Sequence, residues 1–322
     1  MQVEDLKFAS LIDVEELVSY AKIRQNSDGG YSFLRPIYGV EFPSSISETY
    51  YALAILSMLQ EGILRKEKTV EFIRSMQRDN GTFNSPEVAF YTIRSLQLLG
   101  EGLPSTSFAE QFYSLLRQWR MVYEGDGLSY FSSDYDATSS PFRSIYCAVR
   151  ALRLSGLRVD ERDVDWLANH EEEGGFGMHR PDITSTYYAL GALLCAGYQE
   201  EKFSRTAQFI EKCALNEGGY SSIPHSAPAF VESTYFAVAT LGLIGKKTKE
   251  TRKHIKFLCK LQNGNGGFRR ALAGGISTLQ NSYFAAKSLT ILSGDFNRGE
   301  SPVSALDTQY RNDVSILRLQ LR

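Results

Sequence analysis

The hydrophobic and polar positions along this chain form a pattern that recurs six times. Each copy has a polar-faced helical stretch, a turn, and a second stretch that is apolar on nearly all sides. In the polar-faced stretch at 66–78 (KEKTVEFIRSMQR), Val70, Phe72, Ile73 and Met76 follow helical spacing. The second stretches read TYYALAIL, STYYALGALLC and STYFAVATLGLI. Because a helix that is apolar all round is a buried one, the pattern predicts six helical hairpins, each with one buried helix.

The segment between the two helices is rich in glycine, as in NSDGGYSF, EEEGGFGMH and NGNGGFRR. Glycine permits positive φ and close approach of the backbone, so these segments are expected to be tight turns. In four copies a Ser or Thr stands directly before the aromatic residue of the apolar stretch: Thr49, Thr186, Thr234 and Ser282. We expect these hydroxyls to cap the N-termini of the buried helices.

Repeats of roughly 40–55 residues indicate a repeat architecture. Six hairpins, each with one buried and one amphipathic helix, predict an all-α (α/α)6 barrel, with an inner ring of six helices inside an outer ring. The alternative is an open solenoid, which usually carries distinct capping repeats. We expect one barrel over 1–294 and a tail over 295–322 outside the repeat pattern. The third copy has a longer turn, at 130–140.

Composition excludes several classes of function. The 322 residues carry a net charge of −2, which gives no reason to expect a nucleic acid or an anionic membrane as partner. The four cysteines lie in apolar helical stretches without a CxxC pair, as in reduced cytoplasmic proteins. The longest apolar run, near 187–198, is too short for a membrane span. The acidic N-terminus does not read as a signal peptide.

One aromatic residue stands at the same place in each apolar helix. These residues are Tyr50, Phe90, Tyr146, Tyr187, Tyr235 and Tyr283. In a barrel they would surround one end of the central cavity, close to the positive ends of six helix dipoles. They could simply pack helix against helix. They could also line a funnel for a long apolar ligand with an anionic head.

Two local motifs carry a resemblance to a known family. RSIYCA at 143–148 is similar to the R-x-x-Y/F-C-A motif of the β subunit of protein prenyltransferases (farnesyl and geranylgeranyl types). GGFGMHRPD at 174–182 is similar to the GGFGxRPG turn of the same subunits. The resemblance covers roughly 25–294 and extends to the prenyltransferase and terpene cyclase superfamily. It implies an α/α barrel, farnesyl or geranylgeranyl diphosphate as ligand, and a helical α-subunit-like protein as partner.

The resemblance also implies where the ligand would bind. Arg143 matches a family arginine that faces the diphosphate, and His179 and Arg180 lie where the family has basic residues. Arginine suits phosphate because its planar guanidinium forms bidentate, charge-assisted hydrogen bonds. The isoprenoid chain would contact the aromatic residues Tyr50, Tyr146, Tyr187, Tyr235 and Tyr283. A Mg²⁺ ion held by the diphosphate is compatible with this interpretation, although the chain has no DDxxD motif.

The zinc site of the family is not matched. Protein prenyltransferases hold zinc with Asp, Cys and His, and the corresponding residues here are Glu232, Thr234 and Asn281. Thr is a poor zinc ligand and Asn a rare one, so zinc is not expected.

The second chemistry of the superfamily is cyclisation started by a DxDD acid. Repeat 4 offers Asp182 at the first position, but Thr184 replaces the middle, proton-donating Asp. Glu232 occupies that middle position in repeat 5, where burial would raise its pKa toward that of a general acid. The alternative role for Glu232 is to stabilise its helix dipole. The DYDAT segment at 134–138 is interpreted as a solvated turn.

The sequence therefore favours a zinc-independent prenyl transferase or cyclase, with Glu232 and Asp182 as the catalytic candidates. A non-catalytic isoprenoid carrier or a protein scaffold is the alternative, because neither the zinc triad nor DxDD is present. Glycan cleavage would need two carboxylates across a cleft. Glu87 and Glu232 share one register position, but they fall on opposite sides of a six-fold ring.

Overall fold

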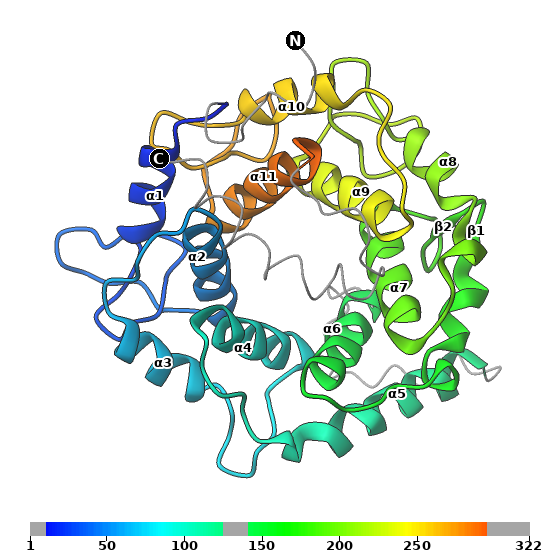
Figure 1. Cartoon of the computed structure of the whole chain (residues 1–322), viewed down its shortest axis with the longest axis horizontal. Helices are drawn as coiled ribbons and strands as arrows, with labels where there is room; N and C mark the ends of the chain where they lie inside the picture. The colour runs from blue at the N-terminus through cyan, green and yellow to red at the C-terminus, as the bar shows by residue number, and fades with distance from the viewer. Residues whose placement is uncertain (1–10, 125–140, 295–322) are drawn as a thin grey trace.

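The computed structural model describes residues 11–124 and 141–294, which form a closed ring (Figure 1). The inner ring consists of α2 (Ile46–Met58), α4 (Pro86–Leu99), α6 (Pro141–Leu154), α7 (Ile183–Ala196), α9 (Val231–Leu243) and α11 (Leu279–Leu292). Each of these helices packs against the next, and α11 packs against α2. The predicted all-α toroid is confirmed, and the open solenoid is wrong.

The outer ring is less regular than the inner one. It contains α1 (Val14–Lys22), α3 (Lys66–Arg74), α5 (Ala109–Glu124), α8 (Thr206–Glu211) and α10 (Thr251–Cys259). In repeat 4 its place is taken by two 3₁₀ helices, η4 (Glu161–Asp163) and η5 (Asp165–His170), and the turn after them is the hairpin β1 (Glu171–Glu172) and β2 (Gly175–Phe176). Two more 3₁₀ helices, η3 (Thr106–Phe108) and η6 (Glu200–Phe203), precede α5 and α8.

Three expectations concern parts of the chain that are not described. The long turn of repeat 3, the DYDAT segment at 134–138 and the tail at 295–322 lie outside the described residues. The domain boundary at 294 stays a prediction. Within 11–124 and 141–294, no helix has the length and apolar character needed to cross a membrane.

The caps of the inner helices are not the hydroxyls that the sequence suggested. The N-cap side chains stand five residues before the ring aromatics and belong to Ser45, Ser85, Asp182 and Thr278. Each accepts the N–H group three residues further on, as N-caps do. The expectation that the Ser or Thr next to the aromatic caps the helix is therefore wrong, because that residue already lies inside the first turn.

The Ser or Thr next to the aromatic instead ties the glycine turn to the inner helix. The hydroxyl of Thr234 accepts the N–H of Tyr220 (3.0 Å) and donates to the carbonyl of Phe230 (2.8 Å). The equivalent hydroxyls of repeats 1, 4 and 6 accept the N–H groups of Tyr31, Phe176 and Phe268. These bonds fix each turn against the helix that follows it.

The turn glycines join one repeat to the next. Gly218 has φ of +97°, and a Cβ on it would lie 2.2 Å from the carbonyl oxygen of Lys253 in α10. Gly266 has φ of +82°, and its Cβ would lie 2.1 Å from the carbonyl oxygen of Glu16 in α1, so this contact closes the outer ring. Only glycine combines positive φ with such close backbone approach.

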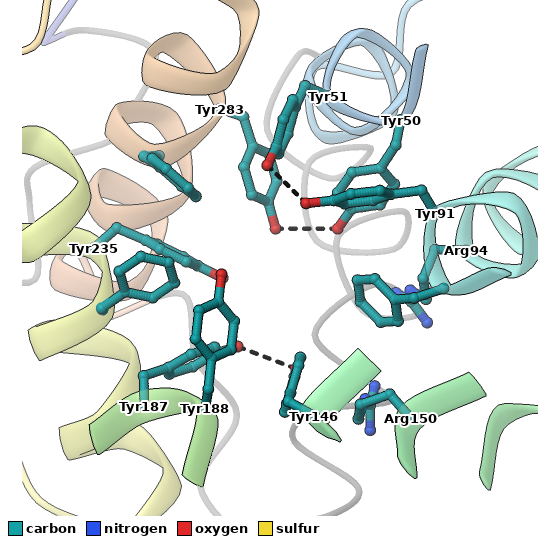
Figure 2. A pocket seen from close by; sticks show the side chains of 13 residues that line it. Tyr50, Tyr51, Tyr91, Arg94, Tyr146, Arg150, Tyr187, Tyr188, Tyr235 and Tyr283 are labelled. Atoms are coloured by element: carbon teal, nitrogen blue, oxygen red, sulfur yellow. Dashed lines mark hydrogen bonds between the residues drawn. The ribbon is translucent and has the colours of Figure 1, made fainter. Parts of the chain in front are cut away.

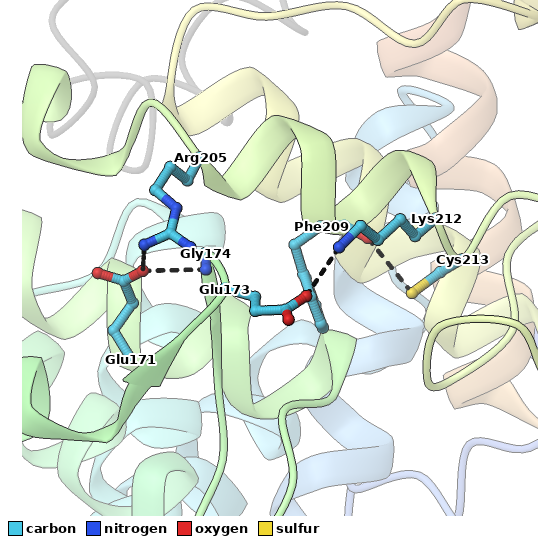
Figure 3. A network of polar contacts seen from close by, with 7 residues as sticks. All are labelled: Glu171, Glu173, Gly174, Arg205, Phe209, Lys212 and Cys213. Carbon is cyan, nitrogen blue, oxygen red and sulfur yellow. Dashed lines mark hydrogen bonds and ion pairs between the residues drawn. The ribbon is translucent and has the colours of Figure 1, made fainter.

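Ion pairs add to the same joint in repeat 4, where the β1–β2 hairpin meets α8 (Figure 3). Lys212 pairs with Glu173 (2.8 Å), and Arg205 lies 3.9 Å from Glu171. These side chains are largely exposed, so the ion pairs contribute little. The close packing at Gly174 is the stronger constraint, because a Cβ there would lie 2.5 Å from the Arg205 carbonyl.

We predict that Gly218→Ala lowers the free energy of unfolding by about 2–4 kcal/mol, because the added methyl group meets both a left-handed backbone and a carbonyl. The matched control is Gly242→Ala in α9, where a Cβ would meet nothing within 4 Å. That change should stabilise the protein by up to about 1 kcal/mol. Urea denaturation of the two variants measures the difference in the free energy of unfolding. Equal effects would show that the close contact between Gly218 and α10 does not stabilise the fold.

Candidate functional site at the centre of the toroid

Aromatic side chains point into the centre of the inner ring, close to the N-termini of its helices (Figure 2). The six ring aromatics lie on the second turns of their helices, and in every repeat except the third another aromatic residue follows directly. Phe284 stacks on Tyr235 with centroids 4.8 Å apart, and Phe236 lies 5.0 Å from Tyr187. The side chains therefore pack helix against helix and also surround one shared space.

That space is small. Among the residues that the structure describes, the aromatic rings leave a cavity of about 50 Å³. One water molecule needs about 10–15 Å³ on this measure, so the cavity holds a few waters. Pockets for drug-sized ligands reach about 300–1,000 Å³. The sequence left two roles open for these aromatic residues, helix packing or a funnel for a ligand, and the structure shows packed rings around a narrow cavity.

Two arginines that the sequence reasoning missed also line this cavity. Arg94 of α4 and Arg150 of α6 are 3% and 2% exposed. Arg94 donates to Oε1 of Gln97 (2.8 Å), and Arg150 donates to the sulfur of Cys195 (3.7 Å). Each arginine stands four residues after a ring aromatic, so it shares that residue's helix face. This spacing was the available signal.

Arg143 lies beside the aromatic cluster, as the resemblance suggested. Its Nη2 donates to the hydroxyl of Tyr91 (3.1 Å), and its Nε is buried with no acceptor among the described residues. The neighbouring Tyr91 keeps the pKa of Arg143 above its usual value, while burial acts in the opposite direction. Of the described carboxylates, none forms an ion pair with Arg143. A half-buried cation of this kind can bind an anion.

The other predicted basic residues are not gathered at this point. His179 and Arg180 are exposed in the turn before α7, and neither lines the central cavity. The structure therefore does not group them with Arg143, and their role in binding stays a prediction.

The residues that correspond to the family's zinc ligands do not fit a zinc site. The hydroxyl of Thr234 is fully buried and is used to hold the turn at Tyr220. Glu232 pairs with Arg270, whose guanidinium also stacks over Phe230 at 4.2 Å. Across 11–124 and 141–294, no three His, Cys, Asp or Glu side chains come together as metal ligands would.

The acid candidates occupy the rim of the inner ring. Asp182 caps α7 and accepts the N–H of Ser185 (2.9 Å) and its hydroxyl (2.6 Å). Burial raises the pKa of Asp182, and these two hydrogen bonds act against the rise. Glu232 is bound by Arg270 and does not line the cavity. Catalytic roles for both acids stay predictions. Glu87, the other acid of the glycan alternative, accepts the hydroxyl of Ser144.

The family comparison covers most of the chain. The profile described as "Prenyltransferase alpha-alpha toroid domain" matches residues 4–88, 84–245 and 179–313. No curated protein sequence matches the chain significantly.

Solved structures share the fold at low sequence identity. The geranylgeranyltransferase-I of Candida albicans, complexed with GGPP, is 14% identical with a TM-score of 0.66, and the match covers 94% of this chain and 98% of the other. The type II terpene cyclase MstE of Scytonema, in complex with geranylgeranyl dihydroxybenzoate, is 12% identical with a TM-score of 0.54 over 89% and 96% of the two chains. A glycosidase is 9% identical with a TM-score of 0.55 over 90% and 98%. These likenesses show the fold alone.

We predict that Thr234 is structural, so Thr234→Val should lower the free energy of unfolding by about 1–3 kcal/mol, because it leaves the Tyr220 N–H without its partner. The control is Thr240→Val in the same helix. The Thr240 hydroxyl is buried and has no partner among the described residues, so its loss should be neutral or stabilising. Thermal or urea unfolding tests this pair, and a neutral Thr234→Val would show that the turn does not need the bond.

Proposed function

The chain belongs to the prenyltransferase alpha-alpha toroid family, and on this premise we propose that it binds an isoprenoid diphosphate at the aromatic centre of the toroid and acts as a zinc-independent prenyl transferase or cyclase. Farnesyl and geranylgeranyl diphosphate are the ligands proposed. The fold likeness to proteins whose structures contain GGPP or a geranylgeranyl compound supports this choice.

The environment of Arg143 is the observation that carries the proposal. Its buried Nε–H has no acceptor among the described residues, and it adjoins a cluster of aromatic rings. A diphosphate supplies acceptor oxygens with negative charge, and aromatic rings suit an unsaturated hydrocarbon chain. His179 and Arg180, which are exposed in the turn before α7, would attract the same anion from solvent.

The prenyl chain would need more room than the cavity provides, so binding requires the aromatic rings to rotate. Tyr187, Tyr235 and Tyr283, with Tyr50 and Tyr146, would then contact the chain. Side-chain rotamer changes of this kind commonly accompany binding. The aromatic rings bury one another when no ligand is bound. A bound prenyl chain would therefore replace contacts between rings by contacts between rings and ligand.

The acids would act at the rim. Glu232 would have to leave Arg270 to serve as a proton donor or acceptor, and Asp182 would have to give up its hydrogen bonds as the N-cap of α7.

A diphosphate would bring Mg²⁺ with it as a counter-ion. We also propose a cytoplasmic location, which the four free cysteines favour, and a helical α-subunit-like partner, by analogy with protein prenyltransferases.

A second candidate is a barrel that keeps the fold as an isoprenoid carrier or a protein scaffold without turnover. The comparisons do not favour it. The small cavity is a specific observation in favour of the scaffold version, because in its present form it admits no prenyl chain.

The test is calorimetric titration with geranylgeranyl diphosphate, with and without Mg²⁺. We predict a Kd on the order of 1 μM or below for the wild type. Arg143→Gln should weaken binding by about 10- to 100-fold, because a charge-assisted hydrogen bond is lost. Arg158→Gln, which removes an exposed arginine paired with Asp160, is the control and should bind as the wild type does. Absence of binding in all three proteins would leave the scaffold as the better account.

A further inference from the structure

Four polar side chains form a continuous hydrogen-bonded chain at the aromatic end of the toroid. Nη2 of Arg143 donates to the hydroxyl of Tyr91 (3.1 Å), which bonds to the hydroxyl of Tyr51 (2.9 Å). Nε2 of Gln280, with the amide nitrogen assigned as the donor, donates to the same Tyr51 hydroxyl (3.1 Å). These residues belong to four consecutive helices of the inner ring, α6, α4, α2 and α11.

These four hydrogen-bonded side chains have one more donor proton than acceptor. Each hydroxyl accepts one N–H, from Arg143 or from Gln280, and each still has its own proton. The bond between the two hydroxyls uses only one of these protons. The other has no acceptor among the described residues, whichever tyrosine carries it. The buried Nε–H of Arg143 is a second donor without an acceptor.

Both tyrosines are buried, at 4% and 6% exposure, and both line the central cavity, where their hydroxyls face each other (Figure 2). Burial raises the pKa of Tyr51 and of Tyr91, so the hydroxyls keep their protons and act as hydrogen-bond donors. Buried donors without acceptors are costly, and a bound acceptor removes that cost.

We propose that Arg143, Tyr91, Tyr51 and Gln280 form an anion subsite, in which the uncommitted tyrosine proton and the Arg143 Nε–H both donate to an anionic oxygen of the ligand. Arg143 and the tyrosine that carries the free proton contact the anion. Gln280 and the other tyrosine position them. The identification of this oxygen as part of a diphosphate rests on the proposed function, whereas the existence of the subsite does not.

The count predicts an unusual pattern among Tyr→Phe variants. If one hydroxyl is removed, the remaining one loses its tyrosine partner, so its proton becomes free for the anion. Tyr51→Phe and Tyr91→Phe should therefore each change affinity by less than about 5-fold. The double variant has no hydroxyl donor left, and its affinity should fall by about 10- to 100-fold. A purely structural role would give additive effects instead.

The experiment is calorimetry with inorganic pyrophosphate as the probe, in phosphate-free buffer, on the full chain. Tyr113→Phe, which removes a hydroxyl that bonds to the Arg158 carbonyl on the outer layer, is the control for loss of a tyrosine hydroxyl. Circular dichroism checks the folding of every variant. Gln280→Glu gives an independent test, because its carboxylate accepts the free proton and repels the anion. It should abolish pyrophosphate binding while the fold is kept.

The outcomes separate this subsite from the proposed function. If pyrophosphate binds with the non-additive pattern but geranylgeranyl diphosphate binds no tighter, the subsite stands and the isoprenoid function fails. If geranylgeranyl diphosphate binds equally well to the double Phe variant, the function stands and the subsite is wrong. Additive losses, unchanged binding by Gln280→Glu, or no pyrophosphate binding by the wild type would also overturn the subsite.

Discussion

The toroid depends on the close backbone approach between glycine turns and the outer layer of the next repeat. At Gly29, Gly174, Gly218 and Gly266 the following outer segment lies so near that no side chain fits. The last of these contacts reaches back to α1, so the same joint that links neighbouring repeats also closes the ring. In repeats 1, 4, 5 and 6 a hydroxyl of the following inner helix then holds the turn in place.

The aromatic centre follows from that geometry. Each inner helix has an aromatic residue on its second turn, and all six of these residues line the same cavity. Eleven aromatic rings line the small cavity there. Tyrosine hydroxyls pair with one another, as in Tyr146–Tyr187 (3.3 Å) and Tyr51–Tyr91 (2.9 Å), so these buried polar atoms have hydrogen-bond partners. The site is thus a packed core that already contains polar groups.

The sequence predicted the features that follow from a repeated local pattern. It did not predict contacts between residues of different repeats. Six copies of one pattern predicted the toroid and the ring aromatics, because helix periodicity and glycine turns are local. The capping role given to Thr234 was wrong, because a hydroxyl one residue from the aromatic can bond either to its own helix or to a turn 14 residues earlier. The hydrogen bonds from Arg143 through Tyr91 to Tyr51 join three repeats, and no local sequence pattern predicts them. Cavity volume likewise depends on how the side chains of all six helices pack.

Ligand binding at this site requires the aromatic centre to open and admit a prenyl chain. Photo-crosslinking with a benzophenone analogue of geranylgeranyl diphosphate, mapped by peptide mass spectrometry, tests it most directly. We expect adducts on the inner helices, at or next to ring aromatics such as Tyr187 and Tyr235, and we expect excess geranylgeranyl diphosphate to suppress them. Adducts confined to the outer helices α3, α8 or α10, or labelling that the competitor does not reduce, would contradict it.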